Sequence, residues 1–332
     1  MKRLIIVLSN VFLLLSCHAT ITIEDTSVSL FSWSSQKWTW VESGDEEIAH
    51  KRVLYEEMFG TGNSFRLNQS LCIFDARAFC FNDGDECRVI DLGEKQQVLS
   101  EPLPDISHHN NAQFLQTYYD KDDKYPLLLL SRGDYPPMQN EFYVIRVKEQ
   151  EGIISFRTIK TIHNTLQEAK NNGSWVVDEE HGKLYLYCMT LSDWRVKENN
   201  RFCIFSFRLP DLISPEGVTL GYSDVLEQWE YTYLIPQGGT YYNGFLFFNV
   251  EELSSVGKKR LTSPKCVIAI NVNNGRIEAI LPLDDHKETE GISIDNDLLF
   301  LSFKNGSKNQ APTTTVFTLS QYTLPSSIVN NY

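Results

Sequence analysis

Short apolar runs separated by polar turns fill the chain from residue 51 to its end. The runs are rich in Val, Ile, Leu, Phe and Tyr, and Asn, Asp and Gly stand between them. This pattern predicts β-strands joined by tight turns. No apolar period of about 3.6 residues continues along the sequence, so few helices are expected. The chain is therefore predicted to be all-β.

Two segments of equal length, 87–114 and 266–293, show that the strands repeat as a unit. Each contains an apolar strand, a polar turn, a second strand, a Leu/Pro exit, a polar linker and the next apolar strand. Such a unit is the back half of one antiparallel sheet followed by the start of the next, as in consecutive blades of a β-propeller. We therefore predict a β-propeller.

Five blades fit the number of strands. They are predicted at 70–101, 112–160, 174–234, 239–281 and 291–320, with strands A to D from the axis outward. The D strand of the third blade is either 217–220 or 229–234. The fifth blade lacks a D strand, and because an open sheet leaves an unpaired edge, an N-terminal strand is expected to close the ring, 51–55 being favoured over 27–33. A sixth blade would require residues 21–66 to supply most of it.

The first residues have the pattern of a secretory signal peptide. Two basic residues precede an apolar run, 4–15, that is too short for a stable transmembrane span. Leu-Leu-Ser-Cys at 14–17 resembles the bacterial lipobox, in which cleavage before Cys17 leaves that thiol to carry the lipid. The alternative is ordinary secretion with cleavage after Ala19. The predicted domains are a signal peptide (1–16), an N-terminal tether (17–45) and one propeller domain (46–332).

Charge and lipidation limit the location and the partners of the mature chain. A lipid on Cys17 would anchor the protein to the bacterial cell envelope, at the outer membrane, and without the lipid it would be soluble in the periplasm or outside the cell. The formal net charge is −13. Because phosphate binding requires a basic face, a nucleic-acid partner is not expected. We expect a monomer.

Six of the seven cysteines lie in the strand-like part of the chain. None is spaced as Cys-x-x-Cys, so no structural zinc site is expected, and no cofactor or other metal is indicated. Cys80 and Cys87 are the candidate disulfide. With Asp83 and Gly84 as a two-residue turn, they would face each other across a hairpin at a Cα separation of about 4.5 to 5.5 Å, which a disulfide tolerates. Two buried free thiols fit the sequence equally well.

The chain resembles the β-propeller lipoproteins of Bacteroidetes-type bacteria, within the wider TolB-like and YVTN-like propeller group. The residues that carry the resemblance are 14–17, 236–241, Asn243-Gly244 and 290–293. They mark the signal cleavage site and the starts of blades rather than any chemistry. The resemblance implies the propeller fold and the envelope location, and it says little about the ligand.

Long loops indicate the face where binding is expected. The B-to-C connections are long, for example 132–140, 190–200 and 251–265, as are D-to-A linkers, whereas the A-to-B and C-to-D turns are tight. Both long classes emerge on one face of a propeller, and extra backbone outside the core tends to carry binding. Residues that precede the inner strands should ring the channel mouth on that face. The candidate ligand-binding residues are His109, Asn111, His163, Gln237 and Glu290.

Two interpretations of this polar ring remain open. It can hold water as part of the scaffold, or it can bind a ligand in a concavity. Asn111 and Glu290 share one offset in the two matched segments, so if one lines the mouth the other should. On the opposite face, Asp75, Asp178 and Asp295 end inner strands and are expected to start A-to-B turns by accepting backbone N–H groups.

Two functions follow from the ligand interpretation. The first is a non-catalytic binding or scaffold protein that recognises a peptide, a protein or a glycan. The alternative is a carbohydrate-active enzyme, a glycoside hydrolase or lyase, which would need two carboxylates at the mouth. Glu290 is one, while Asp105, Asp284 and Asp285 lie further out in linkers. One clear carboxylate favours binding, and no catalytic residue is assigned.

Overall fold

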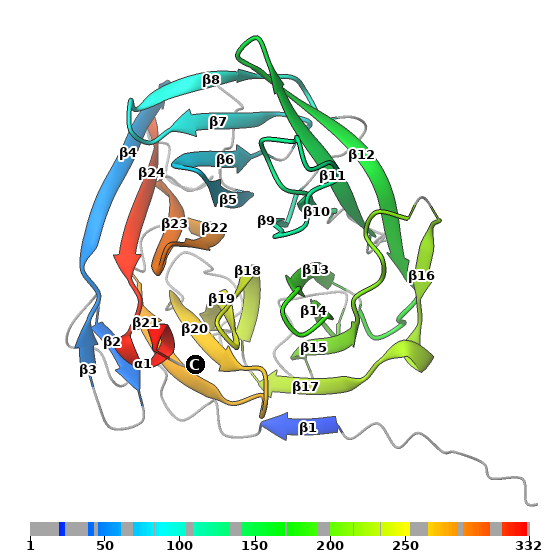
Figure 1. Ribbon diagram of the computed structural model, residues 1–332. Helices are drawn as coiled ribbons and strands as arrows, with labels where there is room; N and C mark the ends of the chain where they lie inside the picture. Colours follow the sequence, from blue (N-terminus) through cyan, green and yellow to red (C-terminus); the bar gives the residue numbers. More distant parts are fainter. Residues whose placement is uncertain are drawn as a thin grey trace, which may run out of the picture.

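The chain forms a five-bladed β-propeller, with four-stranded antiparallel blades around a central axis (Figure 1). The five blades predicted from the sequence are confirmed. The computed structural model describes residues 20–23, 39–42, 46–60, 69–82, 84–103, 109–132, 141–169, 171–191, 200–214, 216–232, 234–252, 265–283, 288–305 and 314–330.

Blades 1 and 2 are joined at their outer edges. From the axis outward, blade 1 consists of β5 (Ser70–Phe74), β6 (Arg77–Phe81), β7 (Cys87–Asp91) and β8 (Gln96–Ser100). Blade 2 consists of β9 (Asn111–Phe114), β10 (Leu128–Arg132), β11 (Glu141–Gln150) and β12 (Ile153–Asn164). The start of β12 pairs in parallel with β8, Ile153 opposite Leu99. The two blades therefore form one continuous sheet.

Blades 3 to 5 complete the ring. Blade 3 consists of β13 (Asn171–Asp178), β14 (Lys183–Met189), β15 (Arg201–Arg208) and β17 (Glu227–Thr232). Blade 4 consists of β18 (Leu234–Tyr242), β19 (Phe245–Glu252), β20 (Lys265–Asn271) and β21 (Ile277–Pro282). Blade 5 consists of β22 (Glu288–Asp295), β23 (Leu298–Asn305), β24 (Thr314–Thr323) and β4 (Lys51–Gly60).

Strand β4 closes the ring by pairing antiparallel with β24. This confirms the prediction that 51–55 supplies the missing strand, and the alternative, 27–33, lies outside the described residues. In blade 3 the D strand is β17, the second of the two predicted segments. The first segment forms β16 (Val218–Leu220), which pairs with β12 of blade 2 instead.

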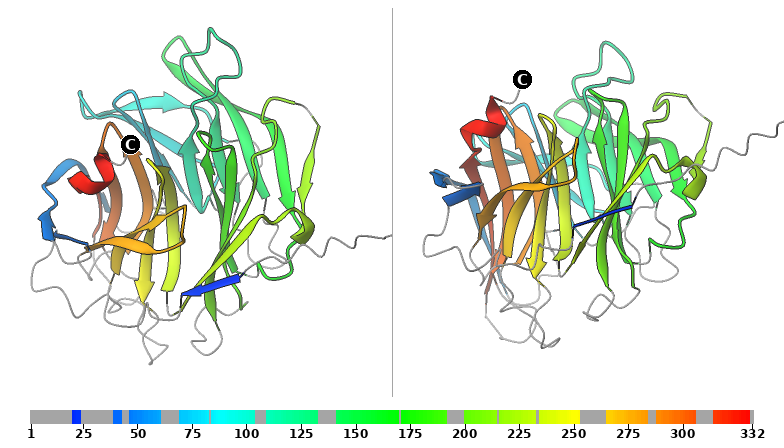
Figure 2. Two further views of the ribbon diagram at one scale, coloured as in Figure 1. Left: turned by 60° about the horizontal axis from the view of Figure 1, so that its bottom comes forward. Right: turned by 90° about the horizontal axis from the view of Figure 1, so that it is seen from below.

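The remaining elements lie at the periphery. Strand β1 (Thr20–Ile23) pairs in parallel with β17, and β2 (Thr39–Glu42) pairs with β21 and with β3 (Glu46–Ile48). The described residues also contain two short helices. One is a 3-10 helix at Tyr222–Asp224, between β16 and β17, and the other is α1 (Ser326–Val329), after β24. Figure 2 shows α1 on the same face as the β11–β12 hairpin turn. In the described part of the chain, no helix is long and apolar enough to cross a membrane.

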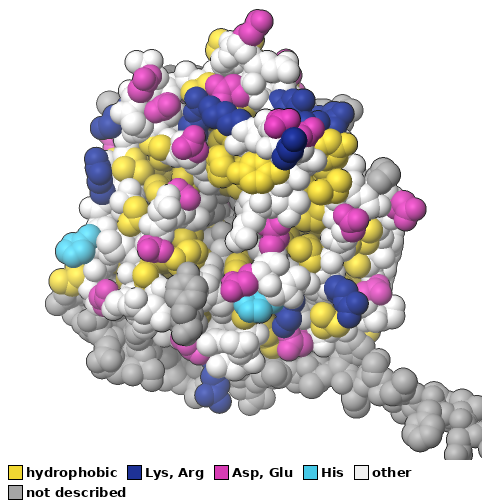
Figure 3. All heavy atoms as spheres, in the orientation of Figure 1, with side chains coloured by type: hydrophobic (Ala, Val, Ile, Leu, Met, Phe, Trp, Pro, Cys, Tyr) yellow, Lys and Arg dark blue, Asp and Glu magenta, His cyan; other side chains and the backbone are white. Residues whose placement is uncertain are grey.

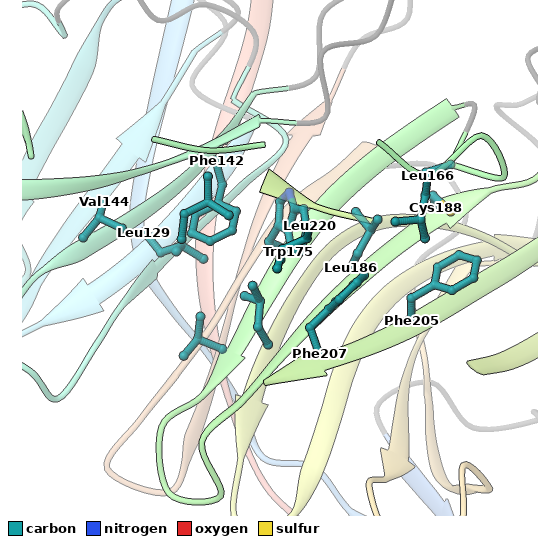
Figure 4. Close-up of a cluster of buried hydrophobic side chains, with 14 of the residues drawn as sticks. Leu129, Phe142, Val144, Leu166, Trp175, Leu186, Cys188, Phe205, Phe207 and Leu220 are labelled. Atoms are coloured by element: carbon teal, nitrogen blue, oxygen red, sulfur yellow. The ribbon is translucent and has the colours of Figure 1, made fainter. Parts of the chain in front are cut away.

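Each pair of neighbouring blades encloses its own hydrophobic cluster, because both faces of every blade are covered. Figure 4 shows the cluster between blades 2 and 3, where Phe142 of β11 packs against Trp175 of β13 with ring centroids 4.8 Å apart. Trp175 also contacts Phe207 of β15. The core is thus five interfaces around an axis rather than one central cluster.

A polar network on Glu149 adds to the interface between blades 1 and 2. Glu149 of β11 accepts hydrogen bonds from Arg77 Nη1 of β6 at 2.8 Å, Lys124 Nζ at 2.7 Å and the Tyr125 hydroxyl at 2.9 Å. Burial acts to raise the pKa of Glu149, but the hydrogen bonds from these three donors outweigh it and lower the pKa to about 2. The carboxylate therefore stays ionised and holds the two blades together.

Candidate functional site

Three consecutive inner strands carry the same irregularity at the same place. In β18, Pro236 pairs with Val250 and Gly239 pairs with Phe248, so two residues oppose one on β19. Such a β-bulge twists the strand and re-aims a side chain, and bulges often lie next to binding sites. The same shift occurs in β13 and in β22. The bulged pairs are Asn172-Gly173, Gln237-Gly238 and Glu290-Gly291, which we call the bulge cluster.

The bulge cluster lies at the end of the blades from which the B-to-C loops leave. Its partner residues on the B strands are close to the C-terminal ends of those strands, and the inner strands line the axis (Figure 1). The three long loops that follow these B strands, 192–199, 253–264 and 306–313, lie outside the described residues, as does 133–140. On the face where binding was expected, the bulge cluster is therefore the part near the axis that the structure describes.

Two glycines of the cluster, Gly238 and Gly291, are required by the close approach of neighbouring blades. A Cβ added to Gly238 would overlap the backbone carbonyl oxygen of Glu290, in the next blade. A Cβ on Gly291 would lie 2.7 Å from Cβ of Leu71, in blade 1. Contacts this short do not occur between real atoms, so only glycine fits. The bulges of blades 4 and 5 thus each place one polar residue next to a glycine that packs against the following blade.

Gln237 and Glu290 are the predicted residues that lie together in the cluster. Both are partly exposed, and the glycine after Gln237 contacts the backbone of Glu290. The Asn249 side-chain amide of β19 donates to the Glu290 carbonyl oxygen at 3.3 Å, which fixes the blade 5 bulge against blade 4. Bulge geometry was not predicted from the sequence. The repeated polar-Gly pair three times along the chain is the signal that could have indicated it.

Asn111 is buried below this cluster. Its side-chain amide donates to the Trp175 carbonyl oxygen at 2.8 Å and accepts from the Gly239 N–H at 3.1 Å. It therefore joins blades 2, 3 and 4 near the axis. The equal offset of Asn111 and Glu290 in the sequence does not give equal positions, because Asn111 pairs regularly with Ser131 whereas Glu290 lies in a bulge.

The two predicted histidines lie elsewhere. His109 is fully buried just before β9, where its ring packs edge-on against Phe81 with centroids 5.7 Å apart. His163 lies near the end of β12, the outermost strand of blade 2, and its Nδ1 is 2.8 Å from Oε1 of Glu141. That pair adjoins the base of the 133–140 loop. Neither histidine joins Gln237 and Glu290.

A buried ion pair holds the base of the loop next to the cluster. Glu251 ends the regular part of β19, Lys265 begins β20, and the two residues are direct cross-strand partners. Their Nζ and Oε1 atoms are 3.3 Å apart, and each side chain is only 3% exposed. The loop 253–264 therefore leaves the blade between two paired charges.

The opposite face carries the A-to-B turns, as predicted. Asn243 and Gly244 both have positive φ, 50° and 82°, as do Asn296 and Asp297, 49° and 62°, so these are the two-residue turns expected between adjacent strands. Asp178 accepts a hydrogen bond from the His181 N–H at 2.9 Å, which confirms its role in starting a turn. Acidic side chains are scattered over this face (Figure 3).

One group on this face contains residue types that bind metal ions. Asp178, Glu180 and His181 each offer one ligand atom within 4.8 Å of the others. His181 Nδ1 is 2.9 Å from the buried Asp178 carboxylate, and the Tyr241 hydroxyl is 3.2 Å from Oε2 of Glu180. These contacts are also those of the hydrogen-bonded β13–β14 turn of blade 3, with Tyr241 of blade 4 beside it. Glu180 and His181 are exposed, and the turn alone explains the arrangement.

The predicted pairing of Cys80 with Cys87 is wrong. Cys80 pairs with Arg88, and Cys87 pairs with Phe81, so the two side chains enter different hydrophobic clusters. Both thiols are free. The Asn82 side-chain oxygen accepts from the Gly84 N–H at 2.8 Å and from the Glu86 N–H at 3.1 Å. This wider loop replaces the expected two-residue turn and shifts the register by one residue. The predicted lipidation site, Cys17, lies outside the described residues.

Comparison with known proteins finds similarity to solved structures at the level of the fold only. No protein family and no curated protein sequence matches the chain. An exo-beta-1,3-galactanase from Phanerochaete chrysosporium is 12% identical, covers 81% of this chain and 64% of its own, and has a TM-score of 0.46. A glutaminyl cyclase from Myxococcus xanthus is 10% identical over 83% of this chain and 98% of its own, with a TM-score of 0.42. A member of the duf4221 family from Bacteroides vulgatus is 10% identical over 83% and 99%, with a TM-score of 0.37. With scores this low, function must be argued from the residues themselves.

Proposed function

We propose that this propeller is a binding protein of the bacterial cell envelope, anchored through Cys17, that holds a polar ligand at the bulge cluster. The observation that carries the proposal is the threefold repeat of a polar-Gly bulge at one end of the axis. A single bulge is a local adjustment of a strand. Three at equivalent positions in adjacent blades support a shared role for this end of the axis.

The chemistry of the cluster favours a ligand rich in hydroxyl or amide groups. Gln237 can donate and accept hydrogen bonds, and an ionised Glu290 accepts them. An acidic protein of net charge −13 disfavours an anionic ligand. A neutral glycan fits these groups, and an extended peptide is the second class. Asn111, which fixes Gly239 beside the blade 4 bulge, would position the site rather than contact the ligand.

Binding is preferred to catalysis because of the number of carboxylates. Glycoside hydrolysis requires two of them, about 5 to 10 Å apart. Within the described residues the bulge cluster contains one, Glu290, and the three predicted in linkers, Asp105, Asp284 and Asp285, lie outside those residues. The enzyme alternative therefore depends on a partner carboxylate from these linkers.

The test compares site variants with matched variants on the outer surface. Neutral oligosaccharides from galactan, arabinan, xylan and mannan, and an array of random peptides, are screened for binding by the full chain, and each hit is titrated by calorimetry. Gln237→Ala and Glu290→Ala should weaken binding at least about tenfold, because each removes hydrogen bonds to the ligand. Gln97→Ala and Glu94→Ala, exposed positions of blade 1, should leave the affinity unchanged.

Two results would contradict the proposal. If a hit binds the Gln237→Ala and Glu290→Ala variants as tightly as the wild type, the ligand site lies elsewhere. If incubation with an oligosaccharide releases reducing ends and Glu290→Gln stops the release, the protein is an enzyme. Unfolding temperatures measured in parallel show whether a loss of binding reflects a loss of structure.

A further inference from the structure

Blade 3 places two cysteines directly opposite each other. Cys188 on β14 and Cys203 on β15 are cross-strand partners in the antiparallel ladder. Both are fully buried and belong to the cluster between blades 2 and 3, so their side chains lie on the same face of the blade. Figure 4 shows Cys188 in that cluster, beside Leu166.

The hydrogen bonds of the ladder fix the separation of their backbones. The Thr190 N–H donates to the Arg201 carbonyl oxygen at 3.0 Å, two pairs further along the same strands. Because hydrogen-bonded and non-hydrogen-bonded pairs alternate, Cys188 and Cys203 form a hydrogen-bonded pair, whose Cα atoms lie about 5.5 Å apart. Disulfides accept Cα separations of about 4.4 to 6.8 Å. The Cβ atoms of opposed residues lie about 4.5 to 5.5 Å apart, whereas a disulfide has about 3.5 to 4.5 Å, so the two thiols, which are free in this structure, can join if the strands approach by about 1 Å.

The other described cysteines lack this geometry. Cys72 on β5 and Cys87 on β7 share a cluster, but β6 lies between their strands, and two strand spacings amount to about 10 Å, too far for a disulfide. Cys80 faces a different cluster. Cys266 is in blade 4, opposite Val250 and Pro282.

We propose that Cys188 and Cys203 form a disulfide when the chain folds in the presence of a thiol oxidant. The two thiols lose two protons and two electrons as the sulfur atoms join, and a disulfide of the oxidant, such as glutathione disulfide or an oxidised dithiol enzyme, takes them and becomes two thiols. The bond would tie the base of the 192–199 loop. Cys188 also lies opposite the blade 3 bulge, so the bond would brace the strand beside that part of the cluster.

Burial determines when the bond can form. Burial in the core raises the pKa of both thiols, with smaller contributions from Glu168 at Cys188 and from the neighbouring thiol at Cys203. Thiol exchange requires the thiolate, which is scarce at a raised pKa, and access for the oxidant. The bond should therefore form before blade 3 packs against blade 2, and the folded protein should protect it from reductants.

The experiment refolds the reduced, denatured full chain with either dithiothreitol or a mixture of glutathione and glutathione disulfide. Peptide mapping under non-reducing conditions should find the Cys188 and Cys203 peptides linked after oxidative refolding, about 2 Da lighter than the sum of the free peptides. The unfolding temperature should rise by several degrees relative to the reduced form. The link should persist when the folded oxidised protein is treated with dithiothreitol.

Serine variants separate this bond from other oxidation. Cys188→Ser and Cys203→Ser should lose both the linked peptides and the rise in unfolding temperature, whereas Cys266→Ser should keep both. The proposal is wrong if wild-type protein refolded with glutathione disulfide has both thiols free, or if the linked peptides contain other cysteines. The wild-type map decides this even where a serine variant fails to fold.

Discussion

The ion pair of Glu251 with Lys265 leads to a prediction about how blade 4 is stabilised. Each side chain is 3% exposed and their charged atoms are 3.3 Å apart. Lys265→Met would remove from the buried Glu251 carboxylate the charge that lies opposite it on β20. Breaking one side of a buried pair costs about 3 to 5 kcal/mol, and at about 2 °C per kcal/mol for a large domain the unfolding temperature should fall by roughly 6 to 10 °C.

The double variant distinguishes the loss of a charge pair from the loss of packing. Glu251→Leu combined with Lys265→Met removes both charges, and buried pairs replaced by apolar residues of similar size are often neutral or stabilising. Its unfolding temperature should therefore return close to that of the wild type. Chemical and thermal unfolding of the wild type, both single variants and the double variant give the coupling energy. If Lys265→Met lowers the free energy of unfolding by less than about 1 kcal/mol, the pair is solvated and the reasoning from burial is wrong.

Three further predictions concern the glycines, the acid range and the lipid. Gly238→Ala should destabilise the protein by about 1 to 3 kcal/mol because its Cβ meets the next blade, while Gly217→Ala, with open space around it, should be neutral in the same urea titration. Because the pKa of Glu149 is lowered from 4.5 to about 2, its contribution to stability is complete above pH 4.5 and is lost as the pH falls through 2. Glu149→Gln should flatten that part of the stability profile, and an unchanged profile would refute the role of the network. Cys17→Ser should abolish both the labelling of the protein with a palmitate analogue and its recovery in the membrane fraction. Labelling that survives would exclude lipidation at that residue.

The strands could be predicted from the sequence because buried blades require apolar runs and their turns require particular residues. Asn243-Gly244 illustrates this, since both residues take the positive φ that a two-residue turn needs. The strand that closes the ring could be predicted from the missing partner of β24 rather than from its own pattern. These features depend on local residue types or on counting unpaired edges.

The details of the site could not be predicted in the same way. The hairpin before Cys87 contains Asp-Gly, but the Asn82 side chain competes for the backbone N–H groups and widens the loop. The bulges depend on contacts between blades, such as Gly238 against Glu290, which are distant in sequence. The apolar pattern of β12 ends before His163, so the sequence places this residue in a linker. The strand in fact continues to Asn164.

The closure of blade 5 has a consequence for how the chain is made. Strand β4 is synthesised before blades 1 to 4, whereas its partner β24 is synthesised after them. Until residues 314–323 emerge from the ribosome, the edge of β4 has no partner, and a free edge is open to pairing with other chains. Contacts between such distant segments also slow folding. A ring closed in this way can be completed only after β24 has been synthesised, so a chaperone that covers β4 would act before the ring closes.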